Sequence, residues 1–162
     1  MVTAGTVRGR TVREHTARYR VVPSDSVRTL AHRGREFLRK PAVMASAKLL
    51  ELGEGICMEA LRESLRPEQC SLGTRQLAAH HGAVWIGDTL AITARRVGGE
   101  DPRSEWYVAM TAIPADDEKP HLAWEGMLSF VVVDLRRFEQ QRTSPRQPAA
   151  AQQPRRRLVR HR

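Results

Sequence analysis

The sequence predicts an α+β fold in which an antiparallel sheet wraps around one long central helix. Three observations lead to this prediction. One stretch after residue 45 has apolar residues at the spacing of a helix, four later stretches have the pattern of strands, and short polar loops join those strands. Consecutive strands with short connections pair antiparallel, because parallel neighbours need a long crossover. The length of 162 residues suits one such domain.

The predicted elements follow one another in a simple order. A short strand at 18–22 ends at Pro23, and residues 31–40 are polar apart from one apolar pair, as in a mobile loop or a short helix. The helix follows Ser46, a favourable N-cap residue ahead of Ala47, and ends before Pro67. Its apolar residues cover a broad face, so we expect other parts of the protein to surround it. Four strands follow, at 71–79, 89–97, 104–113 and 121–135.

The net charge of +9 lies at the two ends of the chain. Residues 1–20 hold five Arg and one acid, residues 141–162 hold seven Arg and no acid, and the segment between them holds 15 bases and 17 acids. We therefore expect a flexible basic arm at 1–16, the folded domain at 17–139 and a disordered tail at 140–162. Any contact of these ends with nucleic acid would be nonspecific.

The composition disfavours several classes of protein. No apolar run reaches the roughly 18–20 residues of a membrane helix, so we expect no membrane partner. Cys57 and Cys70 lie outside any Cys-x-x-Cys motif and no secretory signal is recognised, which favours a cytoplasmic location. Arg outnumbers Lys 24 to 3, as is typical of a GC-rich bacterial genome. His80 and His81 have no third ligand at zinc-type spacing, so we predict no metal and no other cofactor.

Two segments of the chain carry a family resemblance. In the first, Ser46 stands just before the predicted helix and Glu54 follows eight residues later. In the second, a Ser-x-Gly-Thr turn contains Gly73, and His80 lies seven residues further on. With these residues and spacings, the chain resembles the fluoroacetyl-CoA thioesterase family over about residues 19–138.

The resemblance implies the hot-dog fold and an enzyme that hydrolyses acyl thioesters. It also implies a homodimer, since the sites of hot-dog proteins form between two subunits. The candidate catalytic residues are Ser46, Glu54 and His80. The candidate substrate-binding residues are Gly73, Thr74, Phe37 and Lys40.

The residue types suit this chemistry. Thioester hydrolysis needs an activated nucleophile and hydrogen-bond donors for the charge that develops on the carbonyl oxygen. A neutral His can take a proton from water, and a Glu can act as nucleophile or as general base. Backbone N–H groups at a helix start or in a Gly-rich turn can polarise the carbonyl group.

Each candidate also has a structural interpretation. Ser46 is favoured as an N-cap on sequence alone, although its hydroxyl could serve both roles. Glu54 could be a solvated charge, but it borders the apolar face of the helix, where a carboxylate needs a partner. His81 could replace His80, which is preferred for its spacing. Phe37 is a pocket lid or a core contact, and Lys40 is solvated or touches a phosphate of coenzyme A.

We expect the substrate to be a small acyl-CoA or acyl-carrier-protein thioester. A non-catalytic hot-dog module that holds an acyl ligand or a partner is the alternative. The family pattern has a Phe where this chain has Lys40, and a His-x-Arg where this chain has residues 128–130. The sequence therefore leaves the acyl group, and any preference for a fluorinated one, open.

Overall fold

A computed structural model of the protein describes residues 4–7, 10–116 and 118–143. The strands and helices follow in this order: β1 (Ala4–Val7), β2 (Arg10–Arg20), α1 (Ser46–Arg62), β3 (Gln69–His80), β4 (Thr89–Gly98), β5 (Arg103–Ile113), β6 (His121–Asp134) and α2 (Leu135–Thr143). Three short 3-10 helices lie between β2 and α1: η1 (Pro23–Asp25), η2 (Val27–Arg33) and η3 (Arg35–Arg39). None of the helices in these described ranges is long and apolar enough to cross a membrane.

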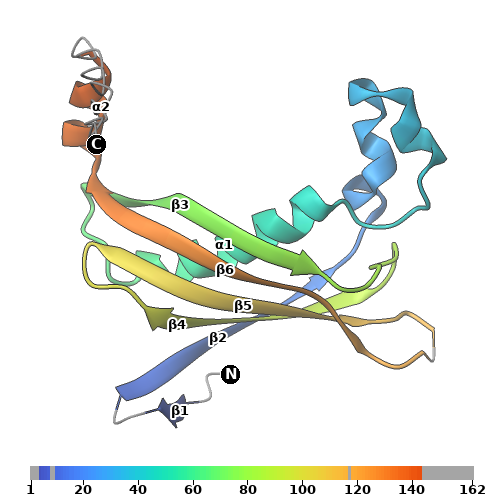
Figure 1. Ribbon diagram of the computed structural model, residues 1–162, viewed down its shortest axis with the longest axis horizontal. Helices are drawn as coiled ribbons and strands as arrows, with labels where there is room; N and C mark the ends of the chain where they lie inside the picture. Colours follow the sequence, from blue (N-terminus) through green and yellow to red (C-terminus); the bar gives the residue numbers. More distant parts are fainter. Residues whose placement is uncertain (1–3, 8–9, 117, 144–162) are drawn as a thin grey trace, which may run out of the picture.

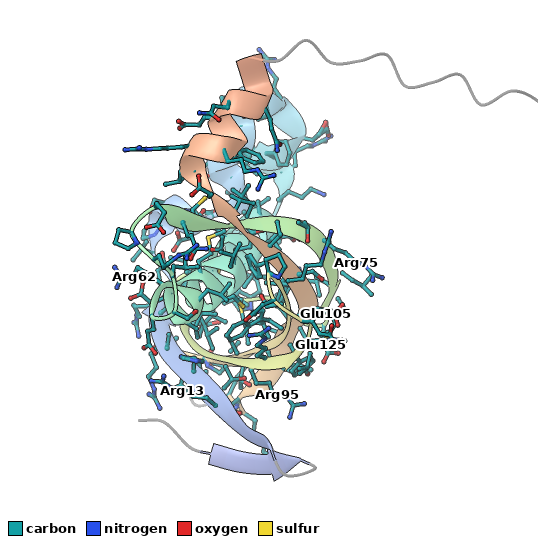
Figure 2. The ribbon with its side chains drawn as sticks, turned by 90° about the vertical axis from the view of Figure 1, so that its left-hand side faces the viewer. Arg13, Arg62, Arg75, Arg95, Glu105 and Glu125 are labelled. Atoms are coloured by element: carbon teal, nitrogen blue, oxygen red, sulfur yellow. The ribbon has the colours of Figure 1, made fainter. Side chains whose placement is uncertain are left out.

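The strands form one antiparallel sheet in the order β1-β2-β4-β5-β6-β3. Figure 1 shows α1 lying along one face of this sheet, and Figure 2 shows the strands curving around the helix. This is the predicted α+β arrangement, and the predicted helix and the four strands after it all form. β3 lies at the opposite edge of the sheet from β1 and β2.

One stripe of α1 packs against the sheet and forms the core. The buried residues of this stripe are Leu49, Gly53, Cys57 and Leu61. A Cβ atom on Gly53 would come within 3.3 Å of Met110 Cε and Trp124 Cη2, so this glycine lets the helix approach the sheet closely. The opposite side of α1 is exposed at Glu51, Gly55 and Glu59. We expected other parts of the protein to surround the helix. Within the described ranges, the sheet covers one side of α1 and the other side is exposed.

The first strand of the domain is longer than predicted. β2 begins at Arg10 instead of residue 18, so much of the predicted flexible arm at 1–16 is strand. Residues 14–20 pair with β4, and this ladder satisfies backbone groups that would otherwise need water. The sequence signal is an alternation, because His15, Ala17 and Tyr19 pair with the buried residues of β4. The short Ala17 and the neighbouring Arg18 hid this alternation in the sequence.

The end of the domain also differs from the prediction. α2 runs from Leu135 to Thr143, so the predicted boundary at residue 139 falls inside a helix. The side chain of Asp134 accepts a hydrogen bond from the backbone N–H of Arg137 at 2.9 Å, which stabilises the start of α2. The rest of the predicted tail, residues 144–162, lies outside the described residues.

The segment predicted as a loop or short helix at 31–40 is helical, because η2 and η3 cover residues 27–33 and 35–39. Figure 1 shows that it projects from the body of the protein beside the start of α1. Buried Asp25 fixes its base, because its carboxylate accepts hydrogen bonds from Tyr19 Oη at 2.8 Å and from the backbone N–H of Val22 at 2.9 Å. The backbone oxygen of Asp25 also accepts from the N–H of Ala45 at 2.8 Å. Asp25 therefore joins the end of β2 to the residue that precedes α1.

Candidate active site

The start of α1 and the end of β3 bring two candidate residues into contact. Ser46 Oγ lies 3.2 Å from His80 Nδ1, and His80 Nε2 lies 2.8 Å from the backbone oxygen of Gly82. A carbonyl oxygen only accepts, so we assign the ring proton to Nε2. In the neutral ring, Nδ1 then accepts a hydrogen bond from the Ser46 hydroxyl. Both side chains are exposed, so a substrate can reach them.

Ser46 is not the N-cap of α1, and that prediction is wrong. The N-cap is Ala45, in an extended conformation and without a side-chain cap hydrogen bond. The helix therefore starts one residue earlier than expected, and the Ser46 hydroxyl faces His80. Within the described residues, the backbone N–H groups of Ser46 and Ala47 have no hydrogen-bond partner. They are available to an oxygen atom of a ligand.

Glu54 lies further along the same side of α1. Its Oε1 accepts a hydrogen bond from Gln76 Nε2 at 2.5 Å. A Cβ atom on Gly73 would lie 2.9 Å from Glu54 Oε1, so the glycine leaves room for this carboxylate. We predicted that Gly73 admits a ligand; in the structure it admits the side chain of Glu54. Gln76 was missed from the sequence, although its spacing of four from His80 places both on one face of a strand.

The contacts form two pairs along a seam between α1 and β3. Ser46 and Glu54 are eight residues apart, or about 12 Å along a helix axis. Gln76 and His80 are four residues apart, or about 13 Å along a strand. Because these spacings match, Ser46 meets His80 at one end and Glu54 meets Gln76 at the other. Within one chain, Glu54 and His80 therefore lie on the same seam without touching each other.

A β-bulge shapes β3 beside Glu54. The register of β3 and β6 shifts between Gly73, which pairs with Phe130, and Arg75, which pairs with Ser129. Thr74 is the extra residue, and its hydroxyl donates a hydrogen bond to the backbone oxygen of Ser129 at 3.1 Å. Bulges redirect side chains and are common next to active sites. The Thr74 hydroxyl thus already has a partner in the fold.

The two remaining candidates lie on the projecting segment. Phe37 belongs to η3 and is half-buried, while Lys40 follows this helix and is exposed. The backbone oxygen of Lys40 accepts a hydrogen bond from Arg28 Nε at 2.6 Å, which closes the segment on itself. Among the described residues, the Lys40 side chain makes no hydrogen bond to the α1–β3 seam. The predicted roles of both residues in substrate binding stay predictions.

Comparison with known proteins finds similar thioesterases, although no family model matches the chain. The chain is 34% identical over 89 residues to the fluoroacetyl-CoA thioesterase of Streptantibioticus cattleyicolor. This match covers 55% of the chain and 64% of that protein, so the chain spans less than two thirds of the relative's length. The solved structure of the fluoroacetyl-CoA thioesterase FlK superposes with a TM-score of 0.69 at 27% identity, over 82% of this chain and 95% of that one.

A hot-dog-like protein from Thermanaerovibrio acidaminovorans superposes with a TM-score of 0.66 at 20% identity, over 82% of this chain and 92% of that one. The chain has the hot-dog fold and resembles the fluoroacetyl-CoA thioesterases. The fold and the family resemblance predicted from the sequence are therefore confirmed. A thioesterase superfamily member from Thermus thermophilus has the same fold, with a TM-score of 0.67 at 19% identity, over 79% of this chain and 86% of that one.

His81, the residue that follows the end of β3, faces away from the helix. His81 Nε2 lies 2.9 Å from Glu125 Oε1, and Tyr107 Oη donates to Glu125 Oε2 at 2.6 Å. The Arg95 guanidinium lies 5.1 Å from the centre of the Tyr107 ring. Figure 2 shows Glu125 and Arg95 on the outer side of the sheet. Adjacent residues of a strand point to opposite faces, which favours His80 over His81 as the residue of the seam.

His81, Glu125, Tyr107 and Arg95 form an outer cluster on the sheet. Two members of this cluster have shifted pKa values. Hydrogen bonds from Tyr107 and from His81 lower the pKa of Glu125 below its usual range. The hydrogen bond to Glu125 and partial burial raise the pKa of Tyr107. Both shifts show that the bond between these side chains favours a charged Glu125 and a neutral Tyr107.

Cys57 does not have the properties of a nucleophile in this hot-dog domain. Burial and the negative charge of nearby Glu54 raise the pKa of its thiol to about 12, so it stays protonated. Cys70 is half-buried, and both cysteines are free. Across the described ranges, no three His, Cys, Asp or Glu side chains gather as metal ligands would.

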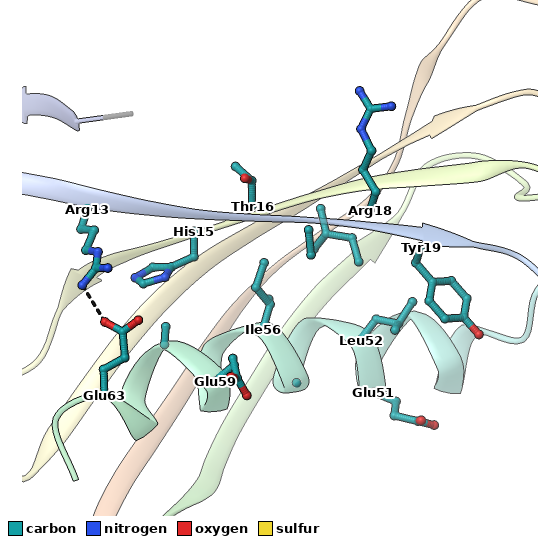
Figure 3. Close-up of a pocket in the computed structure, with 14 residues that line it drawn as sticks. Arg13, His15, Thr16, Arg18, Tyr19, Glu51, Leu52, Ile56, Glu59 and Glu63 are labelled. Atoms are coloured by element: carbon teal, nitrogen blue, oxygen red, sulfur yellow. Dashed lines mark hydrogen bonds and ion pairs between the residues drawn. The ribbon is translucent and has the colours of Figure 1, made fainter. Parts of the chain in front are cut away.

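Two open cavities lie outside the seam. A groove of about 590 Å³ between β2 and α1 (Figure 3) includes His15, Tyr19, Leu52 and Ile56 among its lining residues. A second cavity, of about 640 Å³, lies beside the turn between β4 and β5. Its lining includes Thr74, Arg75, Arg103, Glu105 and Phe130. Of the seven candidate residues, Thr74 is the one that borders either cavity.

Proposed function

We propose that the protein hydrolyses the thioester bond of a small acyl-CoA or acyl-carrier-protein substrate. The observation that carries this proposal is the α1–β3 seam, where Ser46 contacts His80 and Glu54 follows on the same side of the helix. The similarity to a fluoroacetyl-CoA thioesterase supports the same reaction class. A water molecule adds its oxygen to the acyl carbon, the C–S bond breaks, and the sulfur takes up a proton, giving an acid and a thiol.

Ser46, Glu54 and His80 each have a role in this proposed reaction. Glu54 either removes a proton from the attacking water or attacks the acyl carbon itself, giving an anhydride that water then opens. His80 holds an unprotonated Nδ1 that can accept a proton, and the Ser46 hydroxyl orients that nitrogen. The free N–H groups of Ser46 and Ala47 can donate to the thioester oxygen as its negative charge grows.

A short acyl group fits this proposal best. A mutant of FlK, 28% identical to this chain, was solved in complex with fluoroacetate and CoA. The chain has Lys40 where the family pattern has a Phe, so we propose a short acyl group without a requirement for fluorine. Lys40 and Phe37 both belong to the projecting segment, and its position beside the start of α1 (Figure 1) supports a role in covering a substrate there.

We also propose that the protein works as a homodimer joined along β3. This strand is an edge of the sheet, and its residues 73–80 are exposed, including Leu77 with 61% of its surface accessible. An exposed edge strand presents unpaired backbone N–H and C=O groups with which another chain can pair. A twofold pairing of two β3 edges would extend the sheet and place the seam of each chain beside its partner. Leu77→Lys is expected to halve the mass measured by light scattering, and an unchanged mass would reject this interface.

The free thiols and the proposed substrate suggest where the enzyme acts. Cys57 and Cys70 are unpaired, as is usual in a reducing compartment. Acyl-CoA and acyl-carrier-protein thioesters are intracellular metabolites. We therefore propose a bacterial cytoplasmic enzyme, consistent with a curated relative from Streptantibioticus cattleyicolor.

A panel of acyl-CoA thioesters tests the proposed reaction. The purified protein is incubated with acetyl-, fluoroacetyl-, propionyl-, butyryl- and octanoyl-CoA, and the release of free thiol is followed. We expect turnover of at least one short thioester and a loss of about 100-fold or more in kcat for His80→Ala. His81→Ala is the matched control and should retain most of the activity. If the wild type releases no thiol from any of these substrates or from acyl-carrier-protein thioesters, the proposed function is wrong.

A further inference from the structure

Glu54 differs from the neighbouring acidic residues in the partner that holds it. Glu51 forms an ion pair with Lys48 at 2.8 Å, Glu59 with Arg62 at 2.6 Å, and Glu63 with Arg13 at 2.6 Å. Glu54 has no ion pair within the described ranges, and its hydrogen-bond donor is the neutral amide of Gln76. It is therefore the one acid in this part of the described chain whose charge is not compensated by an attached base.

The amide of Gln76 is suited to orient a carboxylate without neutralising it. One oxygen of Glu54, Oε1, accepts from Nε2 of Gln76, and Oε2 has no protein donor among the described residues. An arginine or lysine in the same place would balance the negative charge and weaken Glu54 as a base or nucleophile. A neutral amide fixes the position of Oε1 and leaves Oε2 to react.

The backbone around Gln76 contributes to the same geometry. Gly73 removes the Cβ atom that would collide with Oε1 of Glu54, and the bulge at Thr74 sets which residues of β3 face the helix. Gln76 itself is exposed on an edge strand, so it adds little to the core. Among the described residues, the hydrogen bond to Glu54 is the one side-chain hydrogen bond that Gln76 makes.

We propose that Gln76 is a positioning residue, which fixes the Glu54 carboxylate through Oε1 so that Oε2 faces the reacting atoms. This inference rests on the proposed thioesterase function. Gln76 gains and loses no proton and forms no bond to the substrate; it acts through Glu54. A misplaced catalytic group costs about 100-fold in rate for a displacement of about 1 Å, so the contact is expected to affect kcat more than KM.

Two substitutions test the role of Gln76. Gln76→Met keeps the length of the side chain and removes its N–H donor, and Gln76→Glu keeps the shape but places a second carboxylate against Glu54. We expect roughly 10- to 100-fold lower kcat for both at neutral pH, with KM changed by less than about threefold. The matched control is Gln69→Met, because Gln69 lies on the same strand and its side chain accepts from the backbone N–H of Arg66. This control should leave kcat unchanged.

Combined variants separate positioning from a general loss of structure. If Gln76 acts through Glu54, the double variant with Glu54→Gln and Gln76→Met is no slower than Glu54→Gln alone. A double variant slower by the product of the two single effects would overturn the proposal. So would a folded Gln76→Met protein, checked by circular dichroism, whose kcat is within twofold of the wild type. If Glu54→Gln itself stays fully active, the proposed function fails instead, whatever Gln76 does.

Discussion

The two sides of α1 are built differently. On the side of β2, an open groove of about 590 Å³ has an apolar floor that includes Leu52 and Ile56, and Arg13 pairs with Glu63 at its end (Figure 3). On the side of β3, Ser46 contacts His80 and Glu54 contacts Gln76. The groove of Figure 3 and the contacting polar pairs are thus found on opposite sides of one helix.

This difference favours the contacting side chains on the β3 side over the groove of Figure 3 as the candidate active site. Thioester hydrolysis needs at least one group that can take a proton or attack a carbon. The β2 side offers apolar surface and a charge pair that already satisfies itself. The β3 side offers an unprotonated ring nitrogen, an uncompensated carboxylate and free backbone N–H groups.

A substitution that breaks the contact between Ser46 and His80 is expected to have a large effect on the rate. Ser46→Ala removes the hydroxyl that donates to Nδ1, so we expect kcat to fall by roughly 100-fold. Ser46→Thr keeps the hydroxyl and should retain most of the activity. Steady-state kinetics on the best acyl-CoA of the panel measures both, and equal rates for Ser46→Ala and the wild type would remove Ser46 from the site.

Gly73 of β3 and Gly55 on the exposed side of α1 give the next contrast. Gly73→Ala places a Cβ atom 2.9 Å from Glu54 Oε1, and the flexible carboxylate must move aside. We expect at least about tenfold lower kcat with a small change in stability. Gly55→Ala meets nothing within 4 Å and should raise the unfolding free energy by about 0.5–1 kcal/mol with unchanged kcat. Kinetics and urea unfolding of both variants check this, and the reverse pattern would contradict the comparison.

The outer cluster of the sheet predicts a pH-dependent stability. The pKa of Glu125 is lowered in the folded protein, so this group adds stability above its ordinary pKa and loses it as the pH falls through the folded value. The pKa of Tyr107 is raised, so its contribution persists below its ordinary pKa and is lost at higher pH. We expect Glu125→Gln to lower the Tm at about pH 7 and to match the wild type near about pH 3. A Tm difference that stays constant with pH would contradict this.

The ion pair on the β2 side gives the smallest expected effect. The Arg13 and Glu63 side chains are 57% and 55% exposed, and pairs of this kind contribute little. Arg13→Ala should change the unfolding free energy by less than about 1 kcal/mol and leave kcat unchanged. A loss of activity would show that the groove of Figure 3 takes part in the reaction.

The sequence predicted the central elements because their patterns are local. The helix from Ser46 and the four strands after it follow from apolar spacing, and their order is confirmed. The early part of β2 and the helix α2 were missed, since the charged residues there conceal a strand that depends on pairing with β4 and a helix capped by Asp134. Such elements are stabilised by contacts that lie outside their own sequence pattern.

The candidate site was predictable as a set of residues and not as a geometry. The family resemblance drew attention to Ser46, Glu54 and His80, and it is confirmed as a resemblance. Their catalytic roles stay predictions. Gln76 was missed because its meeting with Glu54 depends on how far α1 is shifted along β3, and no pattern within either segment gives that shift.

A matched pair of variants on the two sides of α1 tests the central claim most directly. Glu54→Gln alters the carboxylate held by Gln76, and Glu51→Gln alters a carboxylate of the same helix that is paired with Lys48 and lines the β2-side groove. The kcat of both is measured with the best short acyl-CoA. We predict a loss of about 100-fold or more for Glu54→Gln and a rate near that of the wild type for Glu51→Gln. Full activity of Glu54→Gln, or a larger loss for Glu51→Gln, would contradict the assignment of the active site to the β3 side.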